Sequence, residues 1–143
     1  MQGHGQALNY VSFRLSDHKG IVRLAVENDG TALEHASRRL QADKDLVKVA
    51  VQNSGTALEF ASVRLKDCPE VVKLALQQNP LALEYASSRC RNNPDLVITA
   101  VQNDGMALRY VGRSLQNDPQ IITAATNSVG AFVVKHIQQQ VAP

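Results

Sequence analysis

Aromatic or imidazole rings paired with arginines are the most suggestive binding groups in the sequence. Such a pair, four residues apart, recurs along the chain, with serine replacing arginine in the last: Tyr10/Arg14, His35/Arg39, Phe60/Arg64, Tyr85/Arg89 and Tyr110/Ser114. In a helix this spacing places both side chains on one face. Stacked units would turn the pairs into a row, the aromatic–arginine ladder, with a spacing of about 10 Å. An ordered row of this kind could bind an extended acidic peptide, or stack the bases of single-stranded nucleic acid.

The ladder also has a purely structural interpretation. Its rings could fill the groove between adjacent units, while the arginine stems cover them and the charged heads stay in water. Glu34, Glu59 and Glu84 sit beside the arginines and would neutralise much of their field, which weakens the case for phosphate binding. For the ladder alone we favour packing, ahead of peptide or protein binding and then of nucleic-acid binding.

Nothing in the sequence resembles a catalytic site, which needs unlike groups to converge at one place. The histidines His4, His18, His35 and His136 fall at unrelated positions, and there is no Gly-rich phosphate loop, HExxH or GxSxG motif. We therefore expect no catalytic residue, no metal site and no cofactor.

The two cysteines, Cys68 and Cys90, lack the CxxC spacing of a zinc or redox site. Cys90 replaces a leucine of the predicted core and should be buried, whereas Cys68 replaces a capping residue and should be partly exposed. Too few for a disulfide framework, they indicate a reducing compartment.

A repeat must position the ladder. Similar segments begin at Gly30, Gly55, Pro80 and Gly105, which are 25 residues apart: GTALEHASRRL, GTALEFASVRL, PLALEYASSRC and GMALRYVGRSL. GQALNYVSFRL at Gly5 continues the series, and the intervening segments repeat in step. A fixed period of this size is typical of a repeat architecture. The predicted units are residues 5–29, 30–54, 55–79, 80–104 and 105–129, with a degenerate half unit at 130–143, in one domain spanning 1–143.

Each unit is predicted to contain two helices. In the first half, Ala32, Leu33, Ala36 and Leu40 form one stripe of an amphipathic helix. The second half shows apolar pairs four residues apart. A β-hairpin at Asp-Gly and a leucine-rich repeat are alternatives, but the flanking residues have helical spacing and the L-x-x-L-x-L pattern is missing.

Local signals place the ends of the second helix. Asn93 and Asp118 are predicted N-caps, each followed by proline at the first helical position. The glycine of Asn-x-Gly, as at Gly30 and Gly105, is predicted to close the helix in a left-handed conformation. Alanine recurs at the helix centre and predicts close approach of another helix: Ala25, Ala50, Ala75, Ala100 and Ala125. The polar end, HIQQQVAP, suits a capping helix.

The repeat motif is G-x-A-L-x-(Y/F/H)-A-S-x-x-L followed by (D/N)-P-(D/E)-(L/V)-V-x-x-A-V-x-x-N, and it closely resembles the repeats of the family called domain of unknown function 4116. The resemblance covers nearly the whole chain. It implies a helical repeat that often occurs in tandem in proteins of bacteria, including intracellular pathogens, and of protists and algae. It implies no established activity and no catalytic residues. The chain departs from the motif at Pro80, Cys90, Lys135 and the terminal half unit.

Composition agrees with a soluble domain of modest charge. Fifteen Lys+Arg against thirteen Asp+Glu leave a net charge of +2, well short of the basicity expected of a nucleic-acid-binding protein. No apolar run of about 18 residues could span a membrane, and the first residues do not form a signal peptide. We expect a cytoplasmic protein without a membrane partner, monomeric or weakly self-associating through exposed repeat ends.

The sequence thus predicts an all-α fold, an α-solenoid (αα-superhelix) of about five and a half 25-residue helix-turn-helix repeats. We expect a non-enzymatic helical-repeat scaffold that binds a protein or peptide, because solenoids provide extended surfaces. The alternative function is a nucleic-acid-binding repeat that uses the aromatic–arginine ladder.

Overall fold

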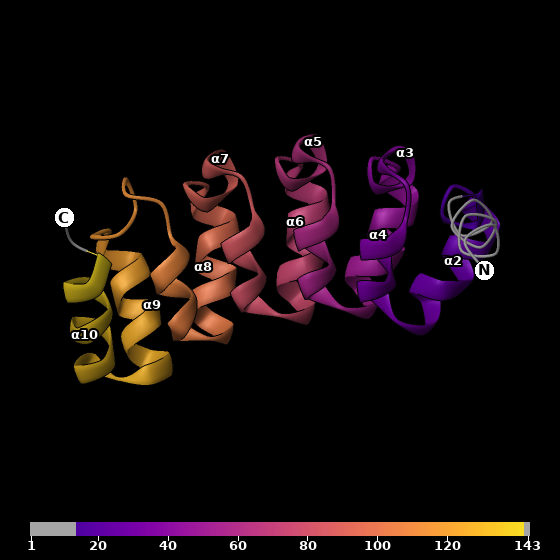
Figure 1. Cartoon of the computed structure of the whole chain (residues 1–143). Coiled ribbons are helices and arrows are strands. Elements are labelled where there is room, and N and C mark those ends of the chain that lie inside the picture. The colour runs from indigo at the N-terminus through magenta and orange to yellow at the C-terminus, as the bar shows by residue number, and fades with distance from the viewer. Residues whose placement is uncertain (1–13, 142–143) are drawn as a thin grey trace, which may run out of the picture.

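The computed structural model describes residues 14–141 and confirms an all-α repeat solenoid. Within these residues, every regular element is a helix. The long helix of each unit packs on the long helices before and after it, so that these helices stand side by side in one row (Figure 1). They are α2 (Lys19–Asn28), α4 (Lys44–Asn53), α6 (Pro69–Gln78), α8 (Pro94–Asn103) and α9 (Pro119–Val129).

The two predicted N-caps each start a long helix. Asn93 accepts a hydrogen bond from the amide of Asp95, and Asp118 accepts from Gln120 and Ile121. His18 also caps its helix, because its Nδ1 accepts from Ile21 N at 3.2 Å. The capping predictions are therefore confirmed.

The first half of the unit is not one α-helix, which corrects the prediction. It begins as a 3-10 helix: η1 (Gly30–His35), η2 (Gly55–Phe60), η3 (Pro80–Tyr85) and η4 (Gly105–Tyr110). An extended residue follows, such as Ala36 with φ −74° and ψ 154°. A single α-helical turn comes next in three units, as α3 (Arg38–Gln41), α5 (Val63–Lys66) and α7 (Ser88–Arg91). These short helices lie along one edge of the row (Figure 1).

A backbone hydrogen bond between neighbouring units explains this break. Ser37 N donates to Ser16 O at 2.8 Å, and the bond recurs one unit later from Ser62 N to Gln41 O at 3.0 Å. It appears again from Ser87 N to Lys66 O and from Gly112 N to Arg91 O. An amide used in this way cannot continue a helix of its own unit. The serine hydroxyl then caps the short helix, as Ser37 does for Leu40 N.

Glycine has a different role from the one predicted. Among the described residues, only Gly130 has a positive φ, at 92°, and it follows the end of α9. Gly30 instead lies against the next long helix, where a Cβ atom would collide with Ala50 O. Its amide donates to Asn53 Oδ1 at 2.7 Å. Glycine is needed there because the two backbones meet, not because of its torsion angles.

The core lies between the row of long helices and the layer of 3-10 helices. The predicted close approach is confirmed at Ala50, Ala75, Ala100 and Ala125, which are fully buried. Ala25 is exposed among the described residues. The segment that would cover it by repeat symmetry, at Gly5, lies outside the described residues.

At the other end, α10 (Ala131–Val141) takes the place of the next 3-10 helix and packs on α9 and η4. It runs on as one helix where the other units break, and His136 and Ile137 stand at the two positions of the break. Ile137 is buried and Gln140 is exposed, as a capping helix requires.

The glycine contact gives a stability prediction. Gly30→Ala should lower the free energy of unfolding by about 1 to 3 kcal/mol, because the added methyl group meets the fixed carbonyl of Ala50. Gly20→Ala is the control, since Gly20 is exposed and a methyl group added there would meet only the His18 ring, at 3.3 Å. Because this contact is with an exposed side chain and not with backbone, Gly20→Ala should cost less stability than Gly30→Ala. Urea denaturation measures both; equal effects of the two substitutions would contradict the close contact.

Candidate functional site

The rings of the ladder are packing residues in the structure. Phe60, Tyr85 and Tyr110 end their 3-10 helices and lie half-buried against the core, while His35 is exposed. Tyr10 lies outside the described residues. The pKa of Tyr85 is raised by desolvation and then by the nearby carboxylates of Glu59 and Glu84.

The predicted pairing of each ring with the arginine four residues later assumed a continuous helix. The extended residue between the 3-10 helix and the short helix removes that helix face. The cation–π contact that the structure shows is instead from Arg109 to its neighbour Tyr110, with the guanidinium carbon 5.9 Å from the ring centroid. The first arginine of the ladder, Arg14, is exposed at the start of the described residues.

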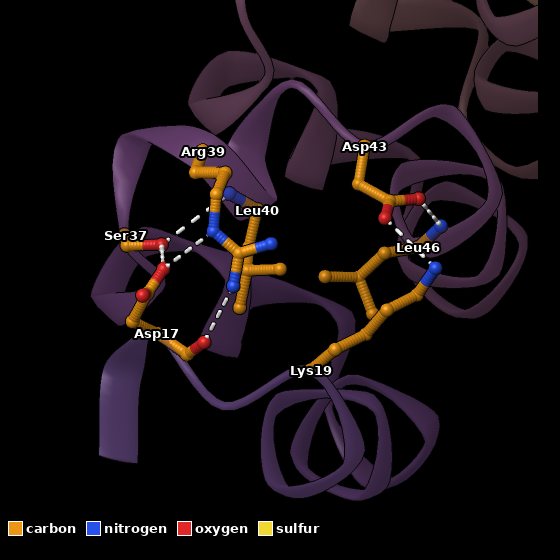
Figure 2. A network of polar contacts seen from close by, with 7 residues as sticks. All are labelled: Asp17, Lys19, Ser37, Arg39, Leu40, Asp43 and Leu46. Atoms are coloured by element: carbon orange, nitrogen blue, oxygen red, sulfur yellow. Dashed lines mark hydrogen bonds and ion pairs between the residues drawn. The ribbon is translucent and has the colours of Figure 1, made fainter. Parts of the chain in front are cut away.

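Arg39 binds the preceding unit instead of its own aromatic position. Its Nε donates to Asp17 Oδ1 at 3.0 Å, and its Nη2 donates to Asp17 O at 2.8 Å (Figure 2). Ser37 Oγ donates to the same carboxylate oxygen at 2.7 Å. The Ser37 hydroxyl, followed by the Arg39 guanidinium, lowers the pKa of Asp17. Serine and arginine thus form a carboxylate-binding pair.

The same arrangement recurs two units later. Ser87 Oγ and Arg89 Nε donate to Asp67 Oδ1 at 2.5 and 3.2 Å, and Arg89 Nη2 donates to Asp67 O at 3.2 Å. The Ser87 hydroxyl and the Arg89 charge lower the pKa of Asp67. Two independent copies of the same geometry show that it is a property of the repeat.

The two other repeats of this contact differ from the arrangement at Asp17 and Asp67. We call the four places where a short segment meets the preceding unit the first junction (Asp17, Ser37, Arg39), second junction (Ala42, Ser62, Arg64), third junction (Asp67, Ser87, Arg89) and fourth junction (Asn92, Gly112, Ser114). At the second, alanine replaces the aspartate. Among the described residues, nothing forms a hydrogen bond or ion pair with the exposed Arg64 side chain.

At the fourth junction an amide replaces the carboxylate. Ser114 Oγ donates to Asn92 Oδ1 at 2.6 Å. Gly112 leaves room for this side chain, because a Cβ atom at Gly112 would collide with Asn92 Oδ1. Turns replace the short helix here.

A recess of about 450 Å³ opens at the fourth junction. Three arginines line it, Arg91, Arg109 and Arg113, together with Ser88, Asn92, Val111 and Gly112. Arg91 is held in place because its Nε donates to Tyr110 O at 2.6 Å. The lining contains no carboxylate, so this arginine recess is a concave site of positive charge. A second recess, beside Ile98 and Thr123 on the long helices, is lined by apolar and neutral polar side chains.

Sequence reasoning identified Arg39, Arg64 and Arg89 but missed their partners. The signal was present: Asp17, Ala42, Asp67 and Asn92 occupy one repeat position, 22 residues before the arginine or serine of the next unit. It was hidden because a single continuous helix was assumed between the two.

Catalytic chemistry gains no support from the described residues. Within 14–141, no group of three or more His, Cys, Asp or Glu side chains could hold a metal ion. Cys90 is buried and desolvation raises its pKa, while Cys68 is half-buried at the start of α6, as predicted. In the same part of the chain, no helix is long and apolar enough to cross a lipid bilayer.

The fold and the recurring junctions define a tandem helical-repeat protein. The family model described as domain of unknown function (DUF4116) matches five overlapping segments, residues 1–41, 18–66, 43–91, 68–116 and 93–135. The chain belongs to this family, which confirms the resemblance inferred from the repeat motif. No curated protein and no solved structure matches the chain.

Ion pairs between long helices add a pH-dependent contribution to stability. Lys44 and Lys48 each place Nζ 2.7 Å from a carboxylate oxygen of Glu70 in the next unit. Hydrogen bonds and charge from Lys44 and then Lys48 lower the pKa of Glu70 from 4.5 to about 2.

Glu70→Gln should therefore reduce the slope of the free energy of unfolding against pH at acid pH. The unfolded state binds more protons between pH about 4.5 and about 2, so the Glu70 contribution is complete above this window and is lost as pH falls through it. Urea denaturation at several pH values and low salt measures the slope. Glu34→Gln, at an exposed glutamate for which the described residues provide no ion pair, is the control for the loss of one negative charge. A Glu70→Gln curve parallel to wild type would contradict the bridge.

Proposed function

We propose that the chain is a non-enzymatic scaffold that binds an acidic segment of a partner protein along the edge formed by the four junctions. The observation that carries the proposal is the arginine recess, in which Arg91, Arg109 and Arg113 meet without a carboxylate in the lining. Guanidinium groups match the planar carboxylate and bind it through paired hydrogen bonds. A concave site with several of them fits an anionic ligand.

Carboxylates are the favoured anion because the same edge already binds them. Asp17 and Asp67 occupy the first and third junctions, each held by a serine hydroxyl and an arginine. The chain therefore contains two bound examples of the proposed ligand group. Neither the recess nor the second junction contains a carboxylate of its own.

Single-stranded nucleic acid is less well supported. Binding of this kind uses exposed aromatic faces on which bases stack. Phe60, Tyr85 and Tyr110 are half-buried against the core, and Glu59 and Glu84 bring negative charge close to Tyr85. The net charge of +2 also provides little general attraction for phosphates.

The cellular setting of this proposal is the cytoplasm. It is supported by the two free cysteines, Cys68 and Cys90, which suit a reducing compartment. The partner would be a protein with an acidic segment, presented without a membrane.

Binding of a labelled decapeptide rich in Asp and Glu, measured by fluorescence anisotropy, tests the proposal. The double variant Arg109→Gln/Arg113→Gln should weaken binding about tenfold, because it removes two charges from the recess and leaves the structural Arg91 in place. The control Lys73→Gln/Lys135→Gln removes two exposed charges elsewhere and should change affinity less than about twofold.

Matched ligands decide between the alternatives. A decapeptide with Asn and Gln in place of Asp and Glu should not bind. Equal losses in the recess and control variants would show nonspecific charge attraction and contradict the proposal. Tighter binding of a single-stranded oligonucleotide than of the acidic peptide would favour the nucleic-acid alternative and overturn the proposed ligand.

A further inference from the structure

We infer that Ala42 opens a specific carboxylate-binding subsite at Ser62 and Arg64, filled by an aspartate or glutamate side chain of the partner. The subsite is part of the proposed peptide-binding edge and in that sense rests on the proposed function. Its evidence is separate, because it comes from comparing the second junction with the first and third.

The backbone of the second junction matches that of the two filled junctions. Ser62 has φ −61° and ψ 158°, against −61° and 159° for Ser37 and −63° and 161° for Ser87. The hydrogen bond from the serine amide to the preceding unit also has the same length at both places: 3.0 Å from Ser62 N to Gln41 O and 3.0 Å from Ser87 N to Lys66 O. The serine and arginine of the second junction are therefore held by the same scaffold as their counterparts.

The donors of the second junction lack the acceptor that the others have. The Ser37 and Ser87 hydroxyls each donate a hydrogen bond to an aspartate oxygen. The Arg39 and Arg89 side chains donate to the same oxygen. At the equivalent place, Ala42 provides only a methyl group and is exposed. A carboxylate from solvent can reach the position that Asp17 and Asp67 occupy from within the chain.

Side chains, not the start of the short helix, provide the binding groups. The Ser62 amide is already bonded to Gln41 O, and the Ser62 oxygen already accepts from Leu65 N at 3.3 Å. The Ser62 hydroxyl proton and the Arg64 guanidinium remain for the ligand. One carboxylate oxygen that accepts from both reproduces the contacts of Asp17.

The positions of the subsite and the recess set the spacing of acidic groups in the partner. The subsite lies at the second junction and the arginine recess at the fourth, two units apart. Neighbouring helices pack about 8 to 10 Å apart, which gives a separation of roughly 20 Å. An extended peptide spans this distance in about six residues. The partner segment should therefore carry two acidic positions separated by about six residues.

A single blocked aspartate, N-acetyl-aspartate N-methylamide, tests the subsite by NMR at constant ionic strength. The Nε–Hε signal of Arg64 should shift saturably on titration, while the signals of Arg39 and Arg89 stay in place because their sites are filled. The blocked asparagine should cause no shift. Failure of Arg64 to respond, or a response to inorganic phosphate but not to the blocked aspartate, would overturn the inference.

Ala42→Asp provides the matched variant, because it supplies the missing carboxylate from within the chain. In the free variant, the Arg64 signal should already resemble those of Arg39 and Arg89, and its response to blocked aspartate should fall at least about tenfold. Thermal unfolding checks that the variant is folded. An unchanged Arg64 response in Ala42→Asp would overturn the inference.

The same titration in Arg109→Gln/Arg113→Gln separates this inference from the proposed function. The Arg64 response should persist there, because the probe does not need the recess. Loss of the response in this variant would contradict a separate subsite. Peptide binding that fails while Arg64 still responds would overturn the proposed function and leave the subsite intact.

Discussion

The structure depends on one contact between neighbouring units, the hydrogen bond from the amide at the end of the 3-10 segment to a carbonyl of the preceding unit. At Ser37 and Ser62 this bond takes an amide that would otherwise continue a helix. The chain therefore breaks, serine becomes the cap of a short new helix, and the arginine two residues later lies beside the preceding unit. Each feature of the junction edge follows from this bond.

The repeat separates what is constant from what varies. The inter-unit hydrogen bond from the amide and the buried alanines of the long helices recur with little change, and they hold the units in register. The residue facing the serine and arginine changes from Asp17 to Ala42, Asp67 and Asn92. A constant scaffold with a variable contact position is how a repeat protein can present different binding groups along one surface. The open second junction and the arginine recess are local consequences of such changes.

The sequence was sufficient for the features that depend on local chemistry and periodicity. The 25-residue period, the caps at Asn93 and Asp118, the buried Cys90 and the close approach at Ala50 could all be predicted, since each leaves a pattern within its own unit. These signals defined the all-α solenoid.

The errors arose where the next unit decides the local structure. The stripe of apolar residues from Ala32 to Leu40 fits an α-helix, but the bond from Ser37 to Ser16 interrupts it. Gly30 resembles a helix-ending glycine, yet glycine is required there because the carbonyl of Ala50, 20 residues later, leaves no room for a side chain. The arginines of the ladder were recognised, but their carboxylate partners lie across the unit boundary. Periodicity within one helix cannot reveal contacts of this kind.

Amide hydrogen exchange at the junctions measures how far the inter-unit hydrogen bond organises the fold. The amides of Ser62 and Ser87 donate across the unit boundary, whereas the amide of Ser88, at the first position of α7, has no partner within its helix. The central role of the inter-unit hydrogen bond predicts that the Ser62 and Ser87 amides exchange on the order of 100-fold more slowly than the Ser88 amide, after correction for intrinsic rates. Exchange of Ser62 and Ser87 as fast as that of Ser88, with the long helices still protected, would contradict it.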